Sequence, residues 1–83
     1  MLNYRGFRAD RLKEAMKENG ATFEDICEGM RRDFYLLWVE SDINYIRRIV
    51  NGKTPPGIAE LFTICGVVGC SADYLLGLKD EMY

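Results

Sequence analysis

Four polar side chains in the middle of the chain recur at the spacing of one helix face. Asn44, Arg47, Arg48 and Asn51 stand at positions i, i+3, i+4 and i+7, which lie on the same side of an α-helix. Arginine can bind guanine through two hydrogen bonds, asparagine can pair with adenine, and either can hold a phosphate. These residues therefore have the chemistry to bind a DNA groove, and the alternative interpretation is a solvated helix face.

The same stretch carries the signals needed to fold as a helix and to pack. Asp42 is a suitable N-cap, Gly52 suits the position after a helix, and Pro55 and Pro56 prevent its continuation. An apolar stripe runs along the opposite side and contains Ile43, Ile46, Ile49 and Val50. The pattern predicts a short helix with an apolar back and a cationic front.

Composition limits the class of protein. The chain has 83 residues, 48% of them hydrophobic, which indicates a single ordered domain, residues 1–83, with a small core. The longest apolar run, residues 34–39, is too short to span a bilayer and no signal-peptide core is present, so we expect a cytoplasmic protein without a membrane partner. Histidine is absent and the three cysteines form no CxxC pair, so we expect no metal and no cofactor.

Charge is unevenly distributed along the chain. The net charge is −2, yet residues 43–54 carry +3 and residues 18–42 carry −5. A small DNA-binding domain needs a basic face and not a basic average. The carboxylates Glu24, Asp25 and Glu28 have no histidine or glycine-rich phosphate loop near them, so we interpret them as a solvated acidic face and expect no enzyme activity.

Periodicity and end signals predict four further helices, and thus an all-α, compact five-helix bundle. The first spans Ala9–Asn19 after an N-terminal arm at residues 1–8, and the second starts at Thr22, where Asp25 completes a capping box. The fourth spans Ile58–Val68, the fifth begins after the cap Ser71, and residues 79–83 form a polar tail. The expected buried side of the fourth helix consists of Ile58, Leu61, Phe62, Ile64, Cys65 and Val68.

The segment 31–41 is the ambiguous part. Its spacing extends the second helix to about residue 39, whereas its aromatic and branched residues also suit a short strand. Its apolar side chains either enlarge the core or contact a partner. The candidate dimer or partner interface consists of Phe34, Tyr35, Leu37, Trp38 and Tyr74.

Three stretches resemble the lambda-repressor-like (Cro/XRE-type) helix-turn-helix domains. Arg11-Leu12-Lys13-Glu14 through Gly20-Ala21-Thr22 is similar to the first helix and the entry to the second, and Asn51-Gly52-Lys53 to the end of the recognition helix. Leu61-Phe62-Thr63-Ile64-Cys65 through Gly69-Cys70-Ser71-Ala72-Asp73-Tyr74-Leu75-Leu76-Gly77-Leu78 is similar to the last two helices. The resemblance covers residues 11–30 and 42–78. It implies a repressor-like regulator of transcription, of a kind common in phages and mobile elements, that binds double-stranded DNA as a homodimer.

The resemblance also implies roles for individual residues. Ile43, Asn44 and Arg48 stand at base-reading positions, and Arg47, Asn51, Lys53 and Thr54 at or near phosphate-contacting ones, with Thr22 and Phe23 at the start of the second helix. Cys27, Cys65 and Cys70 stand at buried packing positions, so we expect no redox or catalytic role for them.

The chain departs from the family pattern at three places. Phe23 and Ile43 replace polar side chains, and about nine extra residues lengthen the turn between the second and third helices, which sets the angle of the recognition helix. The departures motivate a second hypothesis, a protein-binding module, antitoxin-like or inhibitor-like, that uses the apolar insertion at residues 31–41.

Overall fold

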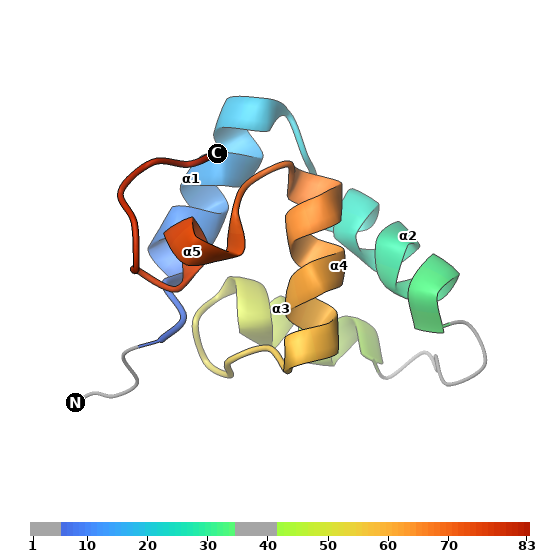
Figure 1. Ribbon diagram of the computed structural model, residues 1–83. Helices are drawn as coiled ribbons and strands as arrows, with labels where there is room; N and C mark the ends of the chain where they lie inside the picture. The colour runs from blue at the N-terminus through green and yellow to red at the C-terminus, as the bar shows by residue number, and fades with distance from the viewer. Residues whose placement is uncertain (1–5, 35–41) are drawn as a thin grey trace.

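The computed structural model describes residues 6–34 and 42–83, and these residues contain five helices and no strand (Figure 1). The helices are α1 (Ala9–Asn19), α2 (Phe23–Phe34), α3 (Asp42–Val50), α4 (Ile58–Val68) and α5 (Ala72–Leu75). The predicted all-α fold is thus confirmed. None of the helices in the described parts of the chain is long and apolar enough to cross a membrane.

Local hydrogen bonds define the helix ends as the sequence predicts. At the start of α2, the Thr22 amide donates to Asp25 Oδ2 at 2.9 Å and the Asp25 amide donates to Thr22 Oγ1 at 3.1 Å, which is a reciprocal capping box. At the end of α3, Gly52 adopts a φ of +78°, and the amides of Gly52 and Lys53 donate to the carbonyls of Ile49 and Arg48. This is a Schellman motif, which needs a residue that tolerates a left-handed backbone.

The core is built from one apolar side of each helix. α3 contributes Ile46 and Ile49, which are 1% and 0% exposed, so its apolar back is anchored in the core. Thirteen hydrophobic residues are buried among those described: Phe7, Leu12, Ala15, Ile26, Cys27, Met30, Ile46, Ile49, Ile64, Val68, Cys70, Tyr74 and Leu75.

Helices α2 and α4 are packed against each other (Figure 1). Gly29 makes the close approach possible, because a Cβ at this position would overlap Val67 Cγ2 and lie 3.3 Å from Thr63 Cγ2. Thr63 is 5% exposed, and its hydroxyl donates to Asp33 Oδ2 at 2.7 Å. This bond lowers the pKa of Asp33, with a further contribution from the neighbouring Arg32.

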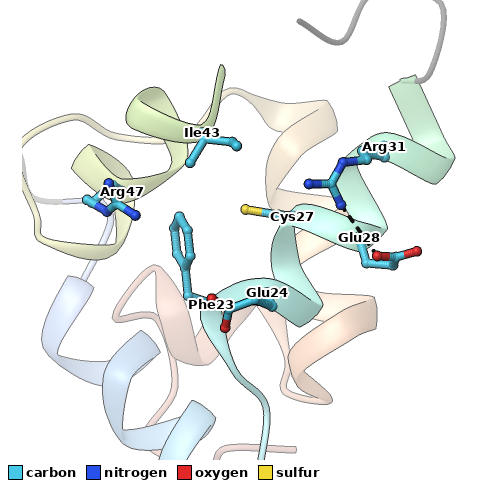
Figure 2. Close-up of a pocket in the computed structure, with 7 residues that line it drawn as sticks. All are labelled: Phe23, Glu24, Cys27, Glu28, Arg31, Ile43 and Arg47. Carbon is cyan, nitrogen blue, oxygen red and sulfur yellow. Dashed lines mark hydrogen bonds and ion pairs between the residues drawn. The ribbon is translucent and has the colours of Figure 1, made fainter. Parts of the chain in front are cut away.

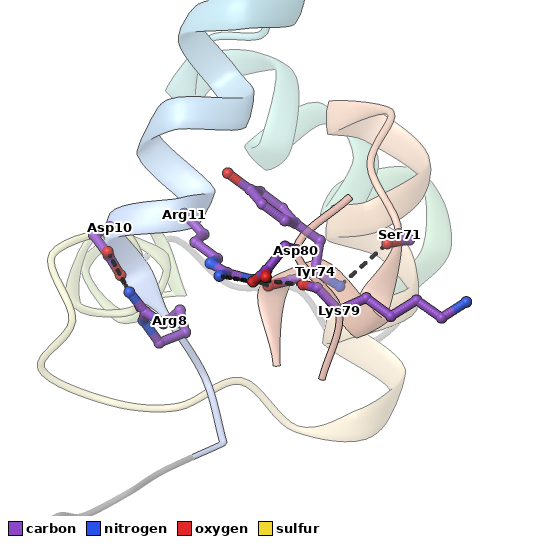
Figure 3. A network of polar contacts seen from close by, with 7 residues as sticks. All are labelled: Arg8, Asp10, Arg11, Ser71, Tyr74, Lys79 and Asp80. Carbon is purple, nitrogen blue, oxygen red and sulfur yellow. Dashed lines mark hydrogen bonds and ion pairs between the residues drawn. The ribbon is translucent and has the colours of Figure 1, made fainter. Parts of the chain in front are cut away.

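The C-terminal residues fold back onto α1 (Figure 3). The Arg11 guanidinium donates to the carbonyls of Tyr74 and Lys79 at 3.0 and 2.6 Å, and contacts the Asp80 carboxylate at 2.9 Å. The Ser71 amide donates to the Met82 carbonyl at 2.7 Å, and Met82 packs against the core. Residues 79–83, predicted as a polar tail, are therefore bonded to the body of the domain.

The structure corrects two predictions of burial. Ile58 and Phe62 are 77% and 72% exposed, although the sequence predicts them on the buried side of α4. Almost every position of this helix is apolar, so periodicity could not separate its inner side from its outer side. Phe7, expected in the N-terminal arm, is 9% exposed and belongs to the core. Residues 1–5 of that arm lie outside the described residues.

Candidate nucleic-acid interface

The polar side chains of α3 gather on one exposed face. Asn44, Arg47, Arg48 and Asn51 are all exposed, and together with Lys53 they line a shallow hollow of about 360 Å³. Ile46 and Ile49 hold the opposite side of the helix in the core. The structure therefore brings together five of the nine predicted DNA-binding residues at one surface.

The three cations of this surface have no acidic partner among the described residues. Of the seven other basic side chains described, five lie within 4.0 Å of a carboxylate, and Lys13 and Lys17 do not; the five are Arg8, Arg11, Arg31, Arg32 and Lys79. In the same parts of the chain, Arg47, Arg48 and Lys53 form no such ion pair, and no carboxylate lines their hollow. Their charge is therefore available to an anion.

Aromatic rings lie beneath both arginines. The Arg47 guanidinium carbon is 5.0 Å from the centre of the Phe23 ring, and that of Arg48 is 5.8 Å from the centre of the Tyr45 ring. Both distances fall in the cation–π range, in which the ring orients the cation without neutralising its charge. Phe23 thus contributes to the surface by supporting Arg47, and not as a polar phosphate ligand.

Tyr45 is in turn fixed by α4. Its hydroxyl donates to Glu60 Oε1 at 2.9 Å, and the same carboxylate oxygen accepts the Gly57 amide at 2.6 Å at the start of α4. Sequence reasoning missed Tyr45 and Glu60 as supporting residues. Two signals were present: Tyr45 precedes Arg48 by three positions, and Glu60 stands at the third position of a helix that begins after Gly57.

A second hollow, of about 320 Å³, lies between α2 and α3 (Figure 2). The Phe23 ring points toward α3 there, and Arg31 contacts Glu28 at 3.4 Å. Burial raises the pKa of the Cys27 thiol on its wall. Ile43 lines this hollow and not the one formed by the polar side of α3. Arg47 lines both, so it is the side chain that the two surfaces share.

The remaining predicted site residues lie apart from the cationic face. The Thr22 hydroxyl is engaged in the capping box of α2, and the half-exposed Thr54 lines neither hollow. Phe34 is half-buried against the core, and Tyr74 is 7% exposed, so Tyr74 offers little surface to a partner. The other predicted interface residues, Tyr35, Leu37 and Trp38, lie outside the described residues.

The arrangement defines an all-helical domain with one cationic, hydrogen-bonding helix face. Within the described ranges, no group of three or more cysteine, aspartate or glutamate side chains could hold a metal ion. Comparison of the chain with family models, with curated proteins and with solved structures gave no significant match.

Proposed function

We propose that this protein is a sequence-specific, repressor-like DNA-binding regulator that inserts α3 into the major groove. The observation that supports the proposal best is the exposed set of Arg47, Arg48 and Lys53, which have no acidic partner among the described residues. Ile46 and Ile49 anchor the helix that carries the two arginines. Arg48 and Asn44 are the proposed base readers, and Arg47, Asn51 and Lys53 hold the phosphate backbone.

The proposed active form is a homodimer on a palindromic site. A two-fold axis would place two copies of α3 about 34–36 Å apart, one turn of B-DNA, so that each reads one half-site. Half-site spacing in the bound DNA is the measurable consequence. A footprint that covers a single half-site at all protein concentrations would contradict the dimer.

Binding to the DNA upstream of the protein's own gene tests the proposal. We expect Arg48→Ala to cost about 1–3 kcal/mol of binding free energy and to relax preference at one base pair. Lys53→Ala should weaken binding to all sequences and make the salt dependence shallower. Lys17→Ala, which removes an exposed cation from α1, is the matched control. Equal losses in Arg48→Ala and Lys17→Ala would refute the proposal.

A second candidate function, protein binding, is favoured by the exposed apolar side chains of α4. Ile58 and Phe62 are one helical turn apart and 77% and 72% exposed, so they form an apolar strip on the surface. If the domain is a protein-binding module, Phe62→Ser and Trp38→Ala abolish capture of a stoichiometric partner while DNA binding persists. If the two variants instead lose DNA binding and capture of a protein partner is unchanged, the result favours the first function alone.

A further inference from the structure

The C-terminal end of α4 brings two cysteines to one turn. Gly69 follows the helix with a φ of +82°, and its amide donates to the Cys65 carbonyl at 2.9 Å. In this left-handed cap the residue after the glycine returns toward the last turn of the helix, so that its side chain can meet that of the bonded carbonyl residue. Cys70 and Cys65 occupy these two positions.

The turn is held from three sides. Asn19 Nδ2 donates to the carbonyls of Val68 and Gly69 at 2.9 and 3.3 Å. Immediately after Cys70, the Ser71 amide donates to the Met82 carbonyl and the Ser71 hydroxyl accepts the Tyr74 amide. These hydrogen bonds therefore fix the backbone that carries Cys70 beside the last turn of α4.

The two thiols differ in exposure and in pKa. The interaction between the two thiols lowers the pKa of Cys65, and the same interaction together with burial raises the pKa of Cys70. Cys65 is also the more exposed of the pair, whereas Cys70 is 6% exposed. Because Cys65 is the more exposed thiol, it is the sulfur that a dissolved oxidant reaches first.

We propose that Cys65 and Cys70 form an oxidation site, at which a hydroperoxide converts the pair to an intramolecular disulfide. The Cys65 thiolate attacks one peroxide oxygen, the O–O bond breaks, and Cys65 becomes a sulfenic acid as hydroxide (or alkoxide) leaves. The Cys70 sulfur then attacks Cys65, the S–S bond forms, the S–O bond breaks, and water departs with the Cys70 proton. Two electrons pass from the two sulfurs to the peroxide.

The disulfide would tie the end of α4 to the residue before the α5 cap. Neither thiol lines the two hollows beside α3, so the oxidation does not depend on whether that face binds DNA. The sequence predicts that all three cysteines have packing roles. The left-handed turn at Gly69 places Cys70 beside the helical turn that carries Cys65, and this placement is the basis for proposing a reaction between them.

Mass spectrometry of the folded protein tests this site. The protein is treated with hydrogen peroxide, the remaining thiols are alkylated, and peptides are analysed. We expect a Cys65–Cys70 disulfide, seen as the loss of two hydrogen atoms, with Cys27 alkylated. Cys70→Ser should retain a sulfenic acid at Cys65 that dimedone traps, and Cys65→Ser should lose both products. Cys27→Ser is the control and should form the disulfide as the unchanged protein does.

Two outcomes would overturn the proposal. One is disulfide formation at the same rate in guanidinium chloride as in buffer, because the folded turn would then contribute nothing. The other is oxidation of Cys27 before Cys65 in the folded chain. The comparison of folded and denatured unchanged protein needs no variant, so it decides the matter even if a serine substitution prevents folding.

Discussion

At the scale of single residues, the cationic face depends on side chains that orient charge without cancelling it. Arg47 and Arg48 lie over aromatic rings, whereas basic residues such as Arg8 and Arg32 are held by carboxylates. An aromatic ring leaves a guanidinium free to exchange its water for a phosphate or a base edge, which a carboxylate does not.

Two substitutions of Tyr45 separate the contribution of its hydroxyl from that of its ring. Tyr45→Phe removes the hydroxyl that donates to Glu60 but keeps the ring beneath Arg48, so we expect a loss of about 1 kcal/mol in unfolding free energy and little change in DNA affinity. Tyr45→Leu removes both, and DNA affinity should fall as well. Chemical denaturation and a binding titration measure the two effects, and equal DNA affinities in both variants would contradict the role of the ring.

Asp33 gives stability a specific dependence on pH. The Thr63 hydroxyl lowers the pKa of this carboxyl in the folded state, so its contribution is full above the ordinary pKa of aspartate, about 3.9, and is lost as pH falls through the lowered value. In Thr63→Val, unfolding free energy should therefore fall less steeply below about pH 4. Acid titration of both proteins checks this, and parallel curves would count against it.

At the scale of elements, the contact between α2 and α4 depends on a glycine. Gly29 is buried, and its missing side chain is where Val67 fits. Gly66 is the opposite case, because it lies exposed on α4, and no atom of the described residues outside its own helix lies within 4 Å of the position that a Cβ would take. Packing therefore requires a glycine at position 29 but not at position 66.

Alanine substitutions distinguish the two glycines. Alanine is favoured over glycine in a helix by about 1 kcal/mol, so Gly66→Ala should stabilise the domain by roughly that amount. Gly29→Ala gains the same preference but forces α2 and α4 apart, with an overpacking cost of about 1–3 kcal/mol. We expect lower unfolding free energy in Gly29→Ala and higher in Gly66→Ala, measured by chemical denaturation. Stabilisation by both would show that α2 and α4 separate without cost.

Helix ends were predictable from sequence, and the exposure of α4 was not. The caps at Thr22, Gly52 and Ser71 act within a few residues, so local sequence is enough to predict them. α4 is apolar on nearly all sides, and the positions of the helices packed against it, α1, α2 and α5, decide that Ile64 is buried while Phe62 is exposed. The cationic set was predictable because polar residues on one helix face need no tertiary knowledge, whereas the Tyr45–Glu60 support joins two helices.

At the scale of the whole molecule, Arg11 connects the two ends of the described fold. It is bonded to residues between 63 and 69 positions later in the chain, and its guanidinium also lies 4.7 Å from the centre of the Tyr74 ring. No sequence pattern predicts a pairing at that separation, so residues 79–83 are predicted only as a polar tail. The side chain is largely buried, with 16% of it exposed.

Removing the Arg11 guanidinium should weaken the attachment of the C-terminal residues to α1. Arg11→Met keeps the apolar stem but removes charge-assisted bonds to two carbonyls, and we expect a loss of about 2 kcal/mol in unfolding free energy. Arg8→Met, which breaks an exposed ion pair with Asp10, is the control and should change little. Thermal denaturation of both variants measures the difference. Similar melting temperatures for the two variants would show that Arg11 does not stabilise the fold by attaching the C-terminal residues to α1.

The Glu60 carboxylate joins the cationic face to a distant amide. Arg48 lies over Tyr45, Tyr45 donates to Glu60, and Glu60 accepts the Gly57 amide. Linkage between coupled sites is reciprocal, so we expect a polyanion that immobilises Arg48 to slow the opening of the first turn of α4 as well. If α3 binds DNA as proposed, exchange of the Gly57 amide with deuterated solvent should slow when DNA is added. The Gly57 amide proton, which does not contact the DNA, would then report that α3 is bound in the major groove.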